Sequence, residues 1–124
     1  MPFTTATANA ILNKILRNTN FNHPAAVYVS LHTGNPGENG ANEVTGGSYA
    51  RKAVTFGAVS NKATSNTAAI EFPGMPAATL THVGLWDASS GGAFWWGGAL
   101  ATSKAVGAGD KFIIPVGELN APLT

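Results

Sequence analysis

The sequence predicts an all-β protein: an antiparallel β-sandwich (jelly-roll-like) of about seven or eight strands with one N-terminal helix. Short segments of alternating apolar residues follow Pro24, roughly every 10 residues, and Gly, Asn, Asp and Ser clusters separate them. This pattern is typical of antiparallel sandwiches and barrels. No helix-length segments lie between the strands, which argues against a parallel sheet.

Length and composition narrow the class of protein. The 124 residues fit one domain, residues 1–124, with a single core. Charged residues are 10% of the chain, against roughly 25% in ordinary soluble domains, and the net charge is +1. We therefore expect no nucleic-acid or membrane partner. The uncharged polar surface favours a protein packed among neighbours. The absence of Cys excludes disulfides and thiolate sites, and no apolar run or signal peptide indicates export, so assembly in the cytoplasm is expected.

The N-terminal segment predicts one helix, residues 4–20. Its apolar residues recur three and four apart and form one face: Ala8, Ile11, Leu12, Ile15 and Leu16. Thr5 or Thr7 is expected to cap its start, and Lys14 and Arg17 lie near its end, where cations favour the helix dipole. We expect the apolar face to cover a face or end of the sheet, and the sequence leaves open whether that sheet belongs to its own domain or to a neighbour.

The remaining chain, residues 26–123, predicts the strands. In "AVYVSLH" apolar residues alternate with Tyr28, Ser30 and His32, so one face of this strand is expected to be buried. "ATLTHVGLW" and "AFWWGGAL" flank the turn residues "DASSGG" and predict a hairpin. "SKAV" and "KFIIPVGEL" flank "GAGD" in the same manner, and "NAPL" is expected to add an edge strand.

Alternation along the strands also predicts the core. The inward residues are expected to be Val54, Phe56, Ile70, Phe72, Val83, Leu85, Phe112 and Ile114. In the aromatic cluster beside Trp86, Phe94 and Trp96 should share one face while Trp95 takes the other. We expect an outward Trp95 to contact another subunit, although sugar stacking on these rings is an alternative.

The stretch "SLHTGNPGENGANEVTGG", Ser30 to Gly47, is too long for a tight hairpin. It lacks the Gly-Lys-Ser/Thr of a phosphate loop and the clustered carboxylates of a calcium loop. It is therefore expected to be a flexible contact arm. With the strand that follows and the outward tryptophan, it supplies the candidate subunit-interface residues: Asn35, Pro36, Glu38, Asn39, Tyr49, Arg51 and Trp95.

No residue pattern indicates catalysis. His23, His32 and His82 lie on separate segments without zinc-ligand spacing. No Gly-x-Ser-x-Gly turn is present, and turn formation accounts for Asp87 and Asp110. We predict no catalytic residue, no metal and no cofactor, and hence a protein that is not an enzyme.

Four segments carry a resemblance to a known family: "LHTGNPGENGANEVTGGSYARKAVTF", "SNTAAIEFP", "THVGLWDASSGG" and "GDKFIIPVGEL". In this order they resemble a family of small virion structural proteins of tailed bacteriophages, labelled tail fibre, minor tail or head decoration proteins. The resemblance runs from Val27 to Leu123, and "EVTGGSYARKAV" and "HVGLWDASSGG" are its most specific parts.

The resemblance implies a structural protein of the virion without catalytic residues. The leading expectation is a capsid cement or decoration protein that bridges major capsid subunits and binds as a homotrimer. The alternative is a minor tail or tail-fibre component with a role in adsorption or glycan binding. Both place the chain among other virion proteins, and the small single domain without fibre repeats favours the cement role.

Overall fold

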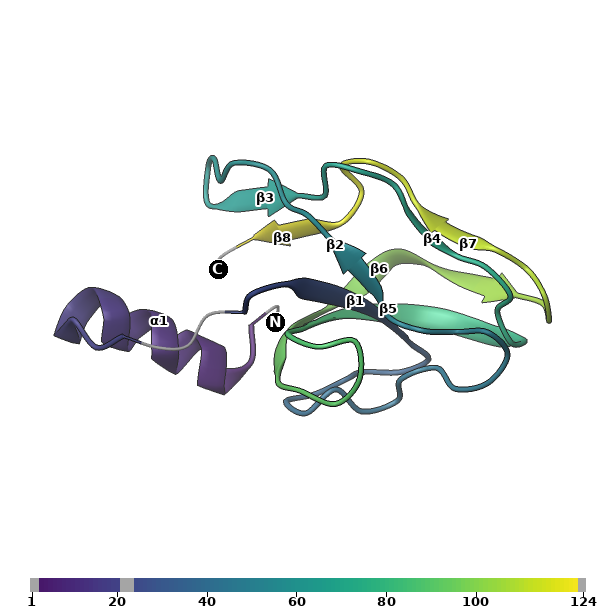
Figure 1. The fold of residues 1–124 in the computed structure, drawn as a ribbon, viewed down its shortest axis with the longest axis horizontal. Coiled ribbons are helices and arrows are strands. Elements are labelled where there is room, and N and C mark those ends of the chain that lie inside the picture. The colour runs from purple at the N-terminus through teal and green to yellow at the C-terminus, as the bar shows by residue number, and fades with distance from the viewer. Residues whose placement is uncertain (1–2, 21–23, 123–124) are drawn as a thin grey trace.

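The computed structural model describes residues 3–20 and 24–122 (Figure 1). Within these ranges one helix, α1 (Thr5–Arg17), precedes eight strands. The strands are β1 (Val27–His32), β2 (Lys52–Val54), β3 (Ala63–Ser65), β4 (Ile70–Phe72), β5 (Ala78–Trp86), β6 (Phe94–Val106), β7 (Phe112–Ile114) and β8 (Asn120–Pro122). All pairings among them are antiparallel. The predicted antiparallel β architecture with one N-terminal helix is confirmed.

The main sheet has the strand order β2-β1-β5-β6. β5 and β6 form the hairpin predicted around "DASSGG", where the carboxylate of Asp87 accepts a 2.8 Å hydrogen bond from the backbone N–H of Ala93. β1 pairs with β5 so that Val29 faces Leu85 across the strands. Directly opposed residues lie on the same face of a sheet, and this pair lies on the face that meets the core.

The second layer consists of two ribbons, β3-β8 and β4-β7, which lie over the main sheet (Figure 1). The predicted edge strand near the C-terminus is β8, which pairs with β3. The hairpin predicted around "GAGD" is wrong, because β6 continues through "SKAV" to Val106 beside β5, whereas β7 pairs with β4. Asp110 shapes the turn between them: its carboxylate accepts from Gly107 N–H at 2.7 Å, and its carbonyl accepts from Met75 N–H at 2.9 Å. These bonds direct the chain out of the main sheet and into the second layer.

The core lies between the two layers. It contains Val29, Leu31, Val44, Val54, Ile70, Phe72, Met75, Leu80, Val83, Leu85, Trp96, Val106, Ile114 and Leu119. Six of the eight predicted core residues are among them. The other two, Phe56 and Phe112, are only partly buried and pack against its edge.

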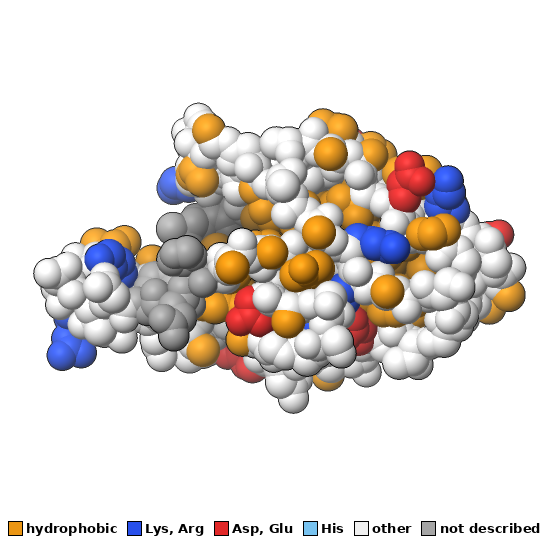
Figure 2. Space-filling model, viewed as in Figure 1, with side chains coloured by type: hydrophobic (Ala, Val, Ile, Leu, Met, Phe, Trp, Pro, Cys, Tyr) orange, Lys and Arg blue, Asp and Glu red, His pale blue; other side chains and the backbone are white. Residues whose placement is uncertain are grey.

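Helix α1 differs from its prediction at both ends and on its apolar face. Thr4, not Thr5 or Thr7, is the N-cap, and the helix ends at Asn18, whose φ of 51° is left-handed. Thr7 is the one helical residue that is fully buried. Leu12, Ile15 and Leu16 are exposed (55, 71 and 73%), so the prediction that the apolar face covers the sheet is wrong, within its own domain, for this half of the helix. Figure 1 shows the helix projecting away from the sheets, and so does the space-filling view in Figure 2.

Candidate functional site

The part of the Ser30 to Gly47 segment that follows β1, residues 33–47, is folded onto the outer face of the main sheet. The backbone N–H of Thr33 donates to the carbonyl of Asn42 at 3.0 Å, and that of Val44 donates to Leu31 at 2.9 Å. Val44 itself is buried in the core (5% exposed). The expected flexible arm is therefore a structured segment, called the cover below (residues 33–47), that hydrogen bonds hold on its own domain.

A hydrogen-bonded chain of polar groups lies beneath this cover. Trp86 Nε1 donates to Ser30 Oγ at 2.8 Å, Ser30 Oγ lies 2.6 Å from His32 Nε2, and His32 Nδ1 lies 2.7 Å from the carbonyl of Ala41. A carbonyl only accepts, so Nδ1 carries the hydrogen and Nε2 accepts from the serine hydroxyl. Burial lowers the pKa of His32 and keeps the ring neutral. This is a structural histidine.

The cover also changes the burial of β1. Ser30 and His32 are fully buried, as are Val29 and Leu31 on the opposite face. The prediction that β1 has one buried face is thus wrong, because the cover turns the outer face of the sheet into a second, smaller core.

A β-bulge divides the aromatic cluster between the two faces of the sheet. Leu85 is opposite Trp96 and Trp86 is opposite Phe94, which leaves Trp95 as the extra residue. Phe94 therefore lies beneath the cover, with its ring centroid 5.0 Å from that of Trp86, while Trp96 lies in the main core. The prediction that Phe94 and Trp96 share one face is wrong.

Arg51 ties the cover to the turn between β5 and β6. Its guanidinium donates two bonds of 2.9 Å to the carboxylate of Glu43 and further bonds to the carbonyls of Ala88 and Gly91 (3.0 and 2.8 Å). It also lies 3.6 Å from the ring centroid of Trp86, a cation–π contact. Arg51 is therefore a structural clamp between segments far apart in the sequence.

Tyr49 belongs to the same cluster. Its hydroxyl donates to Glu43 at 2.8 Å and accepts from Leu31 N–H at 3.0 Å, and burial raises its pKa. Burial also raises the pKa of Glu43, but the hydrogen bonds from Arg51 and Tyr49 outweigh it and leave that pKa below its ordinary value. Both Tyr49 and Arg51, predicted as interface candidates, are engaged within the chain.

The other predicted interface residues fall into two groups. Pro36 is buried within the cover, and Trp95 is half-buried beside α1, where its carbonyl accepts from Thr7 Oγ1 at 2.8 Å. The exposed group contains Asn35, Glu38 and Asn39. Of these, the carboxylate of Glu38 accepts from the backbone N–H of Thr5 at 3.1 Å and from its hydroxyl, so it caps the start of α1 from the cover.

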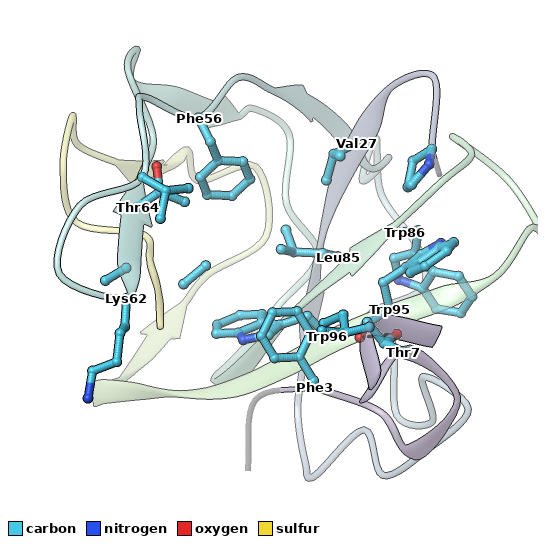
Figure 3. A pocket seen from close by; sticks show the side chains of 15 residues that line it. Phe3, Thr7, Val27, Phe56, Lys62, Thr64, Leu85, Trp86, Trp95 and Trp96 are labelled. Carbon is cyan, nitrogen blue, oxygen red and sulfur yellow. Dashed lines mark hydrogen bonds between the residues drawn. The ribbon is translucent and has the colours of Figure 1, made fainter. Parts of the chain in front are cut away.

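An apolar cleft lies elsewhere, between α1, the end of the main sheet and the β3-β8 ribbon. This cleft has a volume of about 390 Å³. Figure 3 shows aromatic and aliphatic side chains pointing into it from several elements. Its lining consists of Phe3, Thr7, Ile11, Pro24, Val27, Phe56, Val59, Lys62, Ala63, Thr64, Leu85, Trp86, Trp95, Trp96 and Ala121.

The chemistry of this cleft fits apolar contact. Among the described residues that line it, Lys62 is the one titratable group, so this described lining holds no acid–base pair. The indole N–H of Trp96 is buried and has no hydrogen-bond partner. Trp86 and Trp96 are 8 and 5% exposed and offer no open ring face for stacking on a sugar.

No metal site provides a second candidate functional site in the part of the chain that the structure describes. Within it, no three His, Asp or Glu side chains are placed to hold a metal ion. His82 Nδ1 lies 2.8 Å from the hydroxyl of Thr81, and His23 lies outside the described residues. The described helix is also too short and too polar to cross a bilayer.

Sequence reasoning missed the cleft because its walls come from segments that meet only in the fold. Two signals were present in the sequence: Val59, isolated in the polar stretch "GAVSNK", and the apolar second half of the helix. In the structure Val59 is 73% exposed at the cleft. Both signals indicate apolar residues that the chain does not bury by itself.

Comparison with known proteins gives one match along almost the whole chain. The family described as podophage GP4 fiber I protein gp80 matches residues 2–122. No curated protein matches the sequence.

Proposed function

The chain belongs to the podophage GP4 fiber I protein gp80 family, whose members are small structural proteins of tailed-phage virions, and we propose that it is a fibre subunit. In this role it is a non-enzymatic assembly protein that binds copies of itself and other virion proteins. We propose a homotrimer of single domains, each comprising residues 1–124, without a nucleic-acid or membrane partner.

The apolar cleft together with the exposed face of α1 carries this proposal. Leu12, Ile15 and Leu16 continue the apolar lining that begins at Ile11, so one apolar surface extends from the cleft along the helix. Large exposed apolar patches mark sites where proteins bind one another. The described lining of the cleft also offers no paired acid and base for catalysis.

A capsid cement role has weaker support. It was expected because a small single domain without fibre repeats can clamp neighbouring capsid subunits through its loops. The segment expected to form that contact is instead bonded to β1 of its own domain through Ala41 and Val44. The family description names a fibre protein. We therefore favour the fibre role over bridging of major capsid subunits.

Labelling of intact particles tests the proposal. An affinity tag inserted at the exposed turn around Ala108, which does not line the cleft, can be detected on purified virions by gold-conjugated antibody and electron microscopy. Label confined to fibres at the tail is the expected result, and a parallel label on the major capsid protein provides the reference for the head. Tag density spread over the head would contradict the fibre role.

A further inference from the structure

We propose that the cleft and the apolar face of α1 are the two halves of a self-docking surface. In the assembled protein, Leu12, Ile15 and Leu16 of one copy lie in the cleft of a second copy. This inference deepens the proposed function by naming the partner, and it rests on that function only in treating the chain as an assembly subunit.

The first argument is that a single chain does not bury the apolar face of α1. It has 13 residues, close to the length at which an isolated helix is marginal in water. Its attachments are in its first turn, where Thr4 N–H and Thr7 Oγ1 both donate to the carbonyl of Trp95. Its three exposed aliphatic side chains would gain apolar burial only from a partner. The second half of the helix therefore gains most of its stability from a partner.

The second argument is that the cleft matches such a helix in chemistry. Phe3, Val27, Phe56 and Val59 give it an aliphatic and aromatic lining, and Ile11 joins it to the exposed helix face. Figure 3 shows Phe3, Phe56 and Leu85 directed toward the same space from different segments. A helix face of Leu and Ile is the kind of occupant that an apolar groove accepts.

The near absence of charge on both surfaces favours another copy of this chain as the occupant. The exposed helix face carries no charge, since Lys14 and Arg17 project from the other side of α1 at 100° per residue. Of the described residues that line the cleft, Lys62 alone is charged. A nearly uncharged surface meets a copy of itself without repulsion, whereas a strongly acidic or basic partner would find nothing complementary here.

The area of contact requires the assembly to be closed. One helix face of this length in one groove buries on the order of several hundred Å², which is below the roughly 1,000 Å² of a stable interface. In a reciprocal pair or a closed ring, every copy has its helix face covered and its cleft filled. The area per copy then doubles and no apolar face remains open.

Sedimentation of the full-length protein tests the contact. Wild type is expected to associate reversibly, and Ile15→Glu is expected to weaken association at least tenfold while the β-sheet part of its circular dichroism stays unchanged, because Ile15 is exposed on the helix. The matched control is Val116→Glu, which alters another exposed aliphatic residue (60%) that does not line the cleft and should associate like wild type. Wild type that remains monomeric, or association that Ile15→Glu leaves intact, overturns the inference.

Disulfide trapping tests the geometry independently. The chain has no native Cys, so Leu16→Cys protein mixed with Val59→Cys protein can cross-link only through the introduced thiols. A cross-linked species with one copy of each variant is expected, and Val116→Cys in place of Val59→Cys should give none. Equal cross-linking with both partners overturns the inference. These outcomes are independent of the particle labelling. If the protein is monomeric but the label lies on fibres, only this contact is refuted. If the protein associates but the label lies on heads, only the fibre role is refuted.

Discussion

Arg51 should be one of the most important polar residues for stability. Its side chain is 9% exposed and that of its partner Glu43 is 22% exposed. Arg51→Met keeps an apolar stem over Trp86 but removes the bonds to Glu43 and to the carbonyls of Ala88 and Gly91. The variant leaves a partly buried carboxylate with only Tyr49 as a donor among the contacts described above.

The size of the effect follows from burial. Breaking a fully buried ion pair costs about 3–5 kcal/mol, and partial exposure of Glu43 reduces this, so we expect a loss of about 2–4 kcal/mol. For a chain of this length such a loss lowers Tm by roughly 10 °C. Urea unfolding followed by tryptophan fluorescence measures the free energy directly.

The matched control is the exposed ion pair between Lys111 and Glu71, whose side chains are 51 and 54% exposed. Lys111→Met should cost less than about 1 kcal/mol, because exposed pairs contribute little. If Arg51→Met costs no more than Lys111→Met, the clamp does not stabilise the fold and the reasoning is refuted.

The pH dependence provides a second readout for the clamp. The pKa of Glu43 is lowered in the folded protein, so its contribution is present above its ordinary pKa of 4.5 and is lost as the pH falls through the folded pKa. The difference in stability between wild type and Arg51→Met should therefore shrink in acid, where Glu43 is protonated in both. A difference that stays constant with pH would assign the loss to packing alone.

Three further predictions concern the two cores. Burial lowers the pKa of His32 in the folded protein, so near its ordinary value of 6.5 the unfolded chain binds more protons than the folded chain. Stability should therefore fall as the pH decreases from 7 toward the folded pKa. His32→Gln should flatten this part of the stability profile. Gly84→Ala should cost about 1–3 kcal/mol in urea unfolding, because the added Cβ would lie 2.5 Å from the Phe94 ring and 2.7 Å from a serine hydroxyl. Gly57→Ala is the control: its Cβ would meet only ordinary contacts at 3.5 Å, so it should cost much less. Phe72→Ala should cost about 3–5 kcal/mol of stability, since this ring is 1% exposed, and Phe56→Ala should cost less, since that ring is half-buried. Equal losses in the two variants would mean that the assigned burial is wrong.

The sequence predicted those parts of the fold that local patterns determine. The hairpin around "DASSGG" was predicted because turn residues and flanking alternation agree, and Asp87 does bond across that turn. Alternation also placed Ile70 and Phe72 in the core. The hairpin around "GAGD" had the same local signal, but long-range bonds between Asp110 and Met75 redirect the chain. Strand partners depend on such contacts, which the local pattern does not contain.

The functional surfaces were harder to predict for a similar reason. A single bulge at Trp95 reversed the faces assigned to its aromatic neighbours. The composition of the Ser30 to Gly47 segment indicated a mobile loop, whereas buried contacts of Val44 and His32 hold it on the sheet. The amphipathic helix was predicted correctly, but its pattern does not specify whether its own sheet or another copy covers it.

Counting the copies of this chain in purified virions tests the central claim most directly. Quantitative mass spectrometry with isotope-labelled peptides can measure its ratio to the major capsid protein in the same particles. A fibre subunit predicts far fewer copies than the major capsid protein, in a fixed ratio to the tail proteins. A copy number comparable to that of the major capsid protein would contradict the fibre role and restore the capsid decoration role.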